Sequence, residues 1–190
     1  DLHLGEFERL LQTLSCRADA ADPQERGAIF ARMGAIAHEQ LGDWARAAEY
    51  FTQALNLAPS NASAHGVLLD ALCRVYEGAE RYRELVTMLR DRARSVDDQR
   101  ERSELFRRIA RILAKRVGNA DGASEAWLEV LAAGEDQEAL AFLANEAERR
   151  TELGELGTIL ARLAAVAPDA KAEANVRVRR ASVLASIDGR

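Results

Sequence analysis

One apolar pattern recurs along this chain at intervals of about 38 residues, and it leaves few folds possible. In the stretch LGDWARAAEYFTQALNLAP (41–59), the side chains of Trp44, Ala47, Phe51 and Ala54 are spaced so that they share one stripe of an α-helix. The stripe is repeated, and its large apolar members, which lie 37, 38, 38 and 33 residues apart, are Leu14, Phe51, Leu89, Trp127 and Leu160. Stacked supersecondary units produce a repeat period of this length.

A second helix of each unit is expected between successive stripes. In LLDALCRVYEGAERY (68–82), Leu69, Leu72, Cys73 and Tyr76 share one helix face. Every such helix has a small residue at an equivalent position, and these residues are Gly34, Cys73, Ala110, Ala144 and Ala181. Small residues let two helix backbones approach closely, so each unit is predicted to be a helical hairpin. In the last of these helices, the predicted inward face contains Ala174, Val178, Ala181 and Leu184.

Turn and cap signals divide the chain in the same way. Asp22 is predicted to cap a helix that begins near residue 23, with Pro23 at its first position. Glu25 is expected to be the reciprocal acid of a capping box. Gly42 and Gly118 are expected in tight turns between the two helices of a hairpin.

The composition favours helices and excludes several kinds of partner. Of the 190 residues 48% are hydrophobic and only 5% are aromatic, which favours closely packed helices over a β-sandwich. The formal net charge of −5 argues against a nucleic-acid partner, because phosphate binding requires a positive surface. No apolar run is long enough to span a membrane, so no membrane partner is expected. Cys16 and Cys73 have no C-x-x-C spacing, and we expect a reducing, cytoplasmic location.

Taken together, these residues resemble the tetratricopeptide repeat family. Residues 28–61 have the spacing of that family's second helix, and the next unit has the spacing of its first helix and turn. The period exceeds the family's 34 residues, so the array is a divergent one. The predicted structural anchors of the repeat are Gly42, Trp44, Ala47, Phe51, Ala54, Pro59, Leu72, Tyr76, Tyr82, Leu89, Trp127 and Leu160. The resemblance implies an all-α fold: an α-solenoid, a right-handed superhelix of stacked antiparallel helical hairpins with about ten helices.

The chain is predicted to be a single helical-repeat domain, residues 1–190, with no linker long enough to separate domains. Its units are expected at 1–22 (partial), 23–61, 62–98, 99–135, 136–168 and 169–190 (partial). Because both ends interrupt a repeat, we expect a fragment of a longer array or a piece that associates with itself.

No residue pattern in the sequence indicates catalysis, a metal site or a cofactor. The three histidines, His3, His38 and His65, belong to different units and have no second ligand at metal-binding spacing. Phosphate-binding loops and nucleophile elbows are absent from the sequence. Trp44 and Trp127 lie in the apolar stripe, so we interpret both as core residues rather than as platforms for a ligand.

The sequence feature most suggestive of binding is a line of cations in ERSELFRRIARILAKRVG (101–118). Arg107, Arg111 and Lys115 are four residues apart and would follow one helix face. The resemblance places this line in the concave groove that first helices form, with the neighbouring groove positions Asp70, Arg74, Glu77, Ala141, Asn145 and Glu148. An acidic or C-terminal-carboxylate peptide is then a candidate ligand. Alternatively, these cations only solvate the helix or pair with glutamates of its neighbour.

Two functions follow from these observations. The first is a noncatalytic protein–protein interaction scaffold that binds a peptide or helix in its concave groove. The second is a structural array that forms homo-oligomers through its terminal hairpins. Binding of RNA by a helical-repeat code would require basic groove residues in every unit, and only the third unit is basic.

Overall fold

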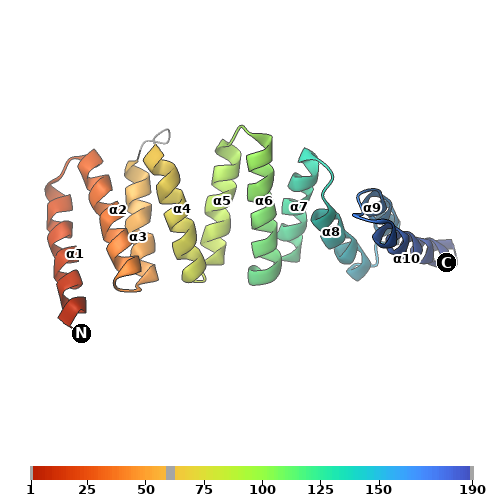
Figure 1. Ribbon diagram of the computed structural model, residues 1–190, viewed down its shortest axis with the longest axis horizontal. Coiled ribbons are helices and arrows are strands. Elements are labelled where there is room, and N and C mark those ends of the chain that lie inside the picture. The colour runs from red at the N-terminus through yellow and green to blue at the C-terminus, as the bar shows by residue number, and fades with distance from the viewer. Residues whose placement is uncertain (1, 59–62, 189–190) are drawn as a thin grey trace. The chain divides into compact units, whose positions relative to one another are not determined.

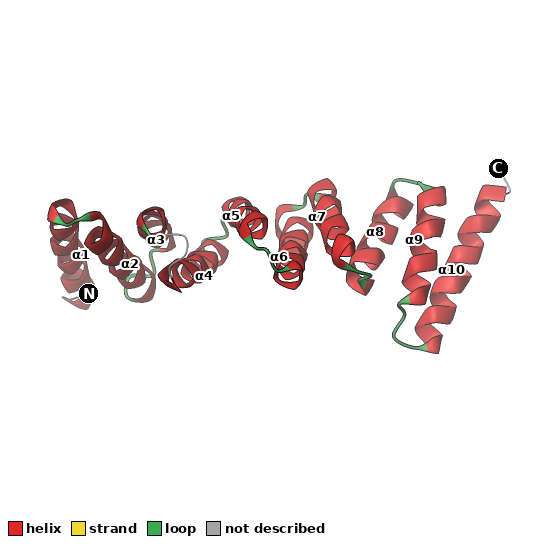
Figure 2. Ribbon diagram, turned by 90° about the horizontal axis from the view of Figure 1, so that it is seen from above, coloured by secondary structure: helices red, strands yellow, loops and turns green. Residues whose placement is uncertain are grey.

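The computed structural model describes residues 2–58 and 63–188. In these two ranges the chain is all α, with ten α-helices, one π-helical segment and no strand (Figures 1 and 2). The elements are α1 (Leu2–Ala20), α2 (Pro23–Glu39), α3 (Trp44–Leu57), α4 (Ser63–Gly78), α5 (Tyr82–Ser95), α6 (Gln99–Ile112), η1 (Leu113–Val117), α7 (Ala120–Ala133), α8 (Gln137–Arg149), α9 (Leu153–Ala165) and α10 (Ala170–Asp188). The predicted all-α class is confirmed.

The chain divides into two compact units, which we call the N-terminal unit (Asp1–Leu85) and the C-terminal unit (Val86–Arg190). In the N-terminal unit, α1 packs on α2, α2 on α3, and α3 on α4. In the C-terminal unit, α6 packs on α7, α7 on α8, α8 on α9, and α9 on α10. Within each hairpin a short turn joins the two helices, so they run in opposite directions, as the stacked hairpins of a helical-repeat fold require (Figure 1). The single domain over residues 1–190 stays a prediction.

The apolar stripes supply the core of each unit. In α3, the side chains of Ala47, Phe51 and Ala54 are buried. Gly34 of α2 lies against the ring of Phe51, so the absence of a side chain there lets the two helices approach closely. Four further predicted anchors are buried as well, namely Leu72, Leu89, Trp127 and Leu160.

Trp44 differs from its predicted core role, because its side chain is 36% exposed. It is the first residue of α3 and therefore lies at the end of the stripe, where fewer neighbours surround it. Its ring meets His38 edge to face, with 4.5 Å between ring centroids, and also lies against Gly78. Tyr76 and Tyr82 are only partly buried, and Pro59 lies outside the described residues.

The predicted inward face of α10 is also wrong. Val178 is 67% exposed and Leu184 is 42% exposed, although Leu184 approaches Gly157 of α9. Ala174 and Ala181 are exposed too, whereas Val183 is buried. The sequence of α10 interleaves apolar residues with arginines on all sides, so its spacing does not single out one apolar face.

Aspartates cap four of the first helices of the hairpins, namely α2, α6, α8 and α10. Asp22 accepts hydrogen bonds from the backbone N–H groups of Gln24 and Glu25, with Pro23 at the first helical position, so this predicted helix start is confirmed. Glu25 does not complete a capping box, since its carboxylate accepts a hydrogen bond from Arg17 instead. The same capping role in α6, α8 and α10 is filled by Asp98, Asp136 and Asp169.

Each described turn inside a hairpin contains one residue with positive φ. These residues are Gly42, Glu80, Gly118 and Thr151, with φ between 55° and 72°. The N–H of the residue that follows each of them donates to a carbonyl near the end of the first helix, at 2.9 Å in all four turns. The predicted turns at Gly42 and Gly118 are confirmed, and η1 ends at the second of them.

Candidate protein-interaction surface

The predicted line of cations lies on α6 and η1 of the C-terminal unit. Arg107 and Arg111 are one turn apart on α6, but Lys115 falls within the π-helical segment. Because a π-helix has more residues per turn than an α-helix, Lys115 does not continue the line at α-helical spacing. We call the surface formed by Arg107, Arg111 and Lys115 with Asn145 and Glu148 of α8 the first-helix face.

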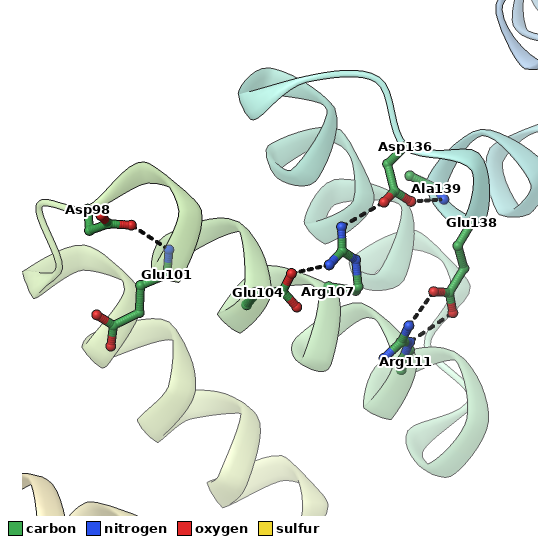
Figure 3. Close-up of polar contacts among 8 residues, drawn as sticks. All are labelled: Asp98, Glu101, Glu104, Arg107, Arg111, Asp136, Glu138 and Ala139. Carbon is green, nitrogen blue, oxygen red and sulfur yellow. Dashed lines mark hydrogen bonds and ion pairs between the residues drawn. The ribbon is translucent and has the colours of Figure 1, made fainter. Parts of the chain in front are cut away.

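Arg107 connects α6 to the start of α8. Its guanidinium donates to Glu104 of its own helix and to Asp136 Oδ2 at 2.7 Å (Figure 3). Asp136 also accepts the N–H of Ala139 at 2.8 Å, so one carboxylate both caps α8 and holds Arg107. Glu104 is the main cause of the raised pKa of Arg107, and Asp136 adds to it. The Arg107 and Asp136 side chains are only 22% and 17% exposed, which makes this pair a link between helices.

Arg111 forms a second link, at a more exposed position. Its Nε and Nη2 atoms donate to the two carboxylate oxygens of Glu138 at 2.8 and 2.5 Å (Figure 3). This bidentate pairing lowers the pKa of Glu138 and raises that of Arg111. The charge of Lys115 also contributes, more weakly, to the lowered pKa of Glu138. The side chains of Arg111 and Glu138 are 49% and 42% exposed.

The other end of α8 is linked to α10. Arg179 donates to Asn145 Oδ1 at 3.2 Å and to Glu148 Oε2 at 2.5 Å. The predicted groove residues Asn145 and Glu148 therefore already have a hydrogen-bond partner within the chain. Ala141 is partly buried between the two sets of contacts. Polar contacts thus connect α6, α8 and α10 in sequence along one surface of the C-terminal unit.

The three remaining predicted groove residues lie elsewhere. Asp70, Arg74 and Glu77 are exposed on α4, which belongs to the N-terminal unit. Arg107 and Arg111 instead pair with acids of α8. Pairing with acids of a neighbouring helix is the alternative to ligand binding that the sequence left open for these two arginines.

A hollow of about 440 Å³ lies beside Arg107, between α6 and the turn that precedes α8. Its wall includes one further cation, Arg100, and the acids Glu104, Glu135 and Asp136. Charge of both signs surrounds this hollow, so it has no preference for an anion. Arg111 and Lys115 lie on a more exposed part of the first-helix face.

Sequence reasoning missed the partners of the two arginines. Asp136 and Glu138 lie in the first turn of α8, where acids are common because they favour the positive end of a helix. The signal available was the DQE sequence (136–138) at the start of the next first helix. Its pairing with Arg107 and Arg111 depends on how α6 and α8 pack, and the sequence does not give that packing.

The described residues contain no group of three or more His, Cys, Asp or Glu side chains that could hold a metal ion. His38 packs on Trp44 and His65 is partly buried, while the side chain of His3 lies outside the described part. Cys16 is exposed and Cys73 is buried, and neither forms a disulfide with another described residue. No helix in the described ranges is long and apolar enough to cross a membrane.

A family match supports the repeat assignment for one segment of the chain. Residues 31–64 match the tetratricopeptide repeat family, and this segment includes the second half of α2 and all of α3. One solved structure similar to this chain is that of an assembly chaperone of RpL4, Acl4 (residues 1–338), with 17% sequence identity and a TM-score of 0.40. The similarity covers 98% of this chain and 81% of the Acl4 chain. No curated protein matches the sequence.

Proposed function

We propose that this chain, which contains a tetratricopeptide repeat match, is a noncatalytic protein-interaction scaffold that binds an acidic peptide on its first-helix face. The observation that carries this proposal is the position of Glu138. Its carboxylate accepts two hydrogen bonds from Arg111, and the charges of Arg111 and Lys115 both lower its pKa, so it marks a place where a carboxylate is stabilised. A glutamate, an aspartate or the C-terminus of a partner would occupy that place.

The Arg111–Glu138 pair is open to exchange. An exposed ion pair contributes only about 0 to 1 kcal/mol, so a ligand carboxylate can replace Glu138 at little cost. The guanidinium then presents the same planar pair of donors to the ligand. Lys115 is exposed and makes no hydrogen bond or ion pair with the rest of the described chain, so it is available to a second acid.

Arg107 has a different role in this proposal. It is more buried than Arg111 and is held by two acids, Glu104 and Asp136. Releasing it would leave Asp136 without its cation and would disturb the start of α8. We therefore assign Arg107 to positioning α8 against α6, and the ligand contacts to Arg111 and Lys115.

A direct binding measurement tests this proposal. The probe is a short, fluorescently labelled, glutamate-rich peptide with a free C-terminal carboxylate, and the readout is fluorescence anisotropy at low salt. Arg111→Ala combined with Lys115→Ala should weaken binding about tenfold or more, the loss expected for two charge-assisted contacts. Glu138→Gln should tighten binding, because it removes the internal competitor. Arg9→Ala in α1 removes one exposed charge from the other unit and should change neither result.

Two outcomes would contradict the proposal. Equal affinity of the parent chain and the Arg111/Lys115 variant would show that these cations do not contact the ligand. A weaker affinity of Glu138→Gln would show that Glu138 supports the site rather than competing for it. The same proposal places the protein in the cytoplasm and assigns it no catalytic activity. It includes no nucleic-acid partner and no membrane partner.

One observation favours a second candidate function, self-association through α10. Val178, Leu184 and Ile187 are large apolar side chains that α10 leaves 38 to 67% exposed. A second copy of the chain could cover them by packing a helix alongside α10. Sedimentation over a range of concentrations should then show a mass that rises with concentration in the parent chain and stays monomeric in Val178→Glu. A monomeric mass for both proteins at every concentration would contradict this second candidate.

A further inference from the structure

A second hollow lies on another side of α6, within the C-terminal unit. Its volume is about 560 Å³, and α5, α6 and α7 each contribute to its wall. None of its lining residues belongs to the first-helix face. We call it the second-helix groove, because its two long walls come from the second helices of adjacent hairpins, α5 and α7.

The two walls carry opposite charges. Arg90 and Arg94 of α5 line one side, and Glu125 and Glu129 of α7 line the other. Within each pair the residues are four apart, so they lie one above the other on a single flank of their helix. Both α5 and α7 run antiparallel to α6, so the basic row and the acidic row run in the same direction.

Three apolar residues and one arginine lie between the charged rows of the two walls. Ala93 and Ala126 close the groove from the two walls and are almost fully buried. Phe106 of α6 also lines the groove and is partly buried. Arg102 of α6 lines it too, with its guanidinium donating to the carbonyl of Val96. Methyl groups at Ala93 and Ala126 leave room for the side chains of another segment, which larger residues would fill.

The charged walls are only weakly engaged within the chain. Arg90 and Glu125 meet across the groove at 4.0 Å, the outer limit of an ion pair. Arg94 pairs with Asp91 of its own helix and is 74% exposed. Glu129 is exposed and makes no hydrogen bond or ion pair with other described residues. One end of the groove therefore presents a cation and an anion on opposite sides, and both can be reached by a ligand.

We propose that the second-helix groove binds an amphipathic helix of a partner protein that carries acids along one flank, bases along the other and small apolar residues between them. The acidic flank would face Arg90 and Arg94, and the basic flank would face Glu125 and Glu129. A helix fits these rows because its own residues at positions i and i+4 have the same separation as each charged pair. Opposite walls also fix the direction of the bound helix, since turning it end for end would bring like charges together. This inference goes beyond the proposed function and concerns a different surface.

The test uses three alanine-based helical peptides of about 20 residues, long enough to form several turns. The first has glutamates on one flank and lysines on the other, the second has glutamates on both flanks, and the third has lysines on both. The measurement is fluorescence anisotropy at low salt. The parent chain should bind the mixed peptide about five- to tenfold more tightly than either single-sign peptide, as expected when one flank of each is mismatched.

Reversing one charge of one wall at a time should change this preference in a defined way. Glu129→Arg leaves Glu125 facing three arginines of the two walls, so the all-glutamate peptide should become the best ligand. Arg94→Glu leaves Arg90 facing three glutamates of the two walls, so the all-lysine peptide should become the best ligand. Both side chains are exposed, and circular dichroism would verify that each variant melts at the temperature of the parent chain.

A control variant distinguishes binding in the second-helix groove from binding to the first-helix face. Arg111→Ala should leave the affinity for the mixed peptide unchanged, while it weakens binding of the glutamate-rich peptide described above. Equal binding of all three peptides by the parent chain would overturn this proposal, and so would no binding at all. An order of affinities that neither wall reversal alters would overturn it as well.

Discussion

The ring of Phe51 lies directly against the backbone of Gly34. A Cβ atom placed on Gly34 would come within 2.9 Å of two ring carbons, which is closer than side-chain atoms pack. The absence of a side chain at Gly34 and the size of Phe51 therefore together determine how closely α2 and α3 pack.

Gly34→Ala should destabilise the chain, although alanine is the better helix former. The clash with Phe51 should lower the free energy of unfolding by about 1 to 3 kcal/mol, measured by urea denaturation. Gly5→Ala is the matched control, because a Cβ at Gly5 would have no neighbour within 4 Å, and it should stabilise α1 by about 0.5 to 1 kcal/mol. Adding Phe51→Leu to Gly34→Ala should restore part of the loss. A Gly34→Ala chain as stable as the parent would contradict this packing.

Thr151 and Gly118 should respond in opposite ways to a change at the hairpin turn. Both have left-handed backbone conformations, with φ of 62° and 72°, which strain a residue that has a Cβ. Thr151→Gly should therefore raise the melting temperature, because it increases the free energy of unfolding by about 1 kcal/mol. Gly118→Ala should lower the melting temperature, because it decreases that free energy by a similar amount. If both substitutions shifted the melting temperature in the same direction, strain in the turn would not explain them.

Two adjacent residues of α7 test which side of the helix faces the core. Trp127 is 2% exposed and Leu128 is 56% exposed. Trp127→Asp should abolish cooperative unfolding of the C-terminal unit, because it buries an unpaired charge. Leu128→Asp should change the free energy of unfolding by about 0.5 kcal/mol or less. Circular dichroism at the helical band is the suitable measurement, and similar melting curves for the two variants would contradict the assignment.

The Glu138–Arg111 pair should make stability depend on pH in the acid range. The pKa of Glu138 lies below its ordinary value of 4.5 in the folded chain, so the unfolded chain binds the proton more readily. The stabilisation is therefore fully present above pH 4.5 and is lost as the pH falls through the lowered pKa of Glu138. Because the pair is half-exposed, the effect should not exceed about 1 kcal/mol.

The measurement is the difference in unfolding free energy between the parent chain and Glu138→Gln at several pH values. The difference should be constant near neutral pH and should vanish in acid. Glu129→Gln is the control, because Glu129 makes no ion pair in the described part of the chain and its removal should give no such trend. A pH-independent difference for Glu138→Gln would contradict the role of the pair.

The period of apolar residues predicted much of the fold. Phe51, Leu89, Trp127 and Leu160 are buried because each lies in the middle of a helix, where neighbours cover it on both sides. The same reasoning failed for Trp44, which has the right spacing but lies at the first turn of α3. Periodicity identifies the face on which a residue lies, but burial also depends on how far along the helix the residue is.

The turns and the candidate site were predicted less completely. Glycines at residues 42 and 118 indicated two hairpin turns, whereas Glu80 and Thr151 adopt the same conformation without any sequence signal. For the site, the sequence identified Arg107 and Arg111 but not their partners on α8. The paired residues of α6 and α8 lie 27 and 29 positions apart in the chain. Whether they meet depends on the axial offset between the two helices, and side-chain spacing within one helix contains no information on that offset.

The most direct test of the proposed scaffold function is an NMR titration of the isotopically labelled chain with the glutamate-rich peptide. The proposal predicts that backbone amide signals shift in the second half of α6, in η1 and in the first turn of α8, around Arg111, Lys115 and Glu138. These shifts should be lost in high salt, because the contacts are exposed and ionic. Shifts confined to other helices, or no shifts at saturating peptide, would contradict it.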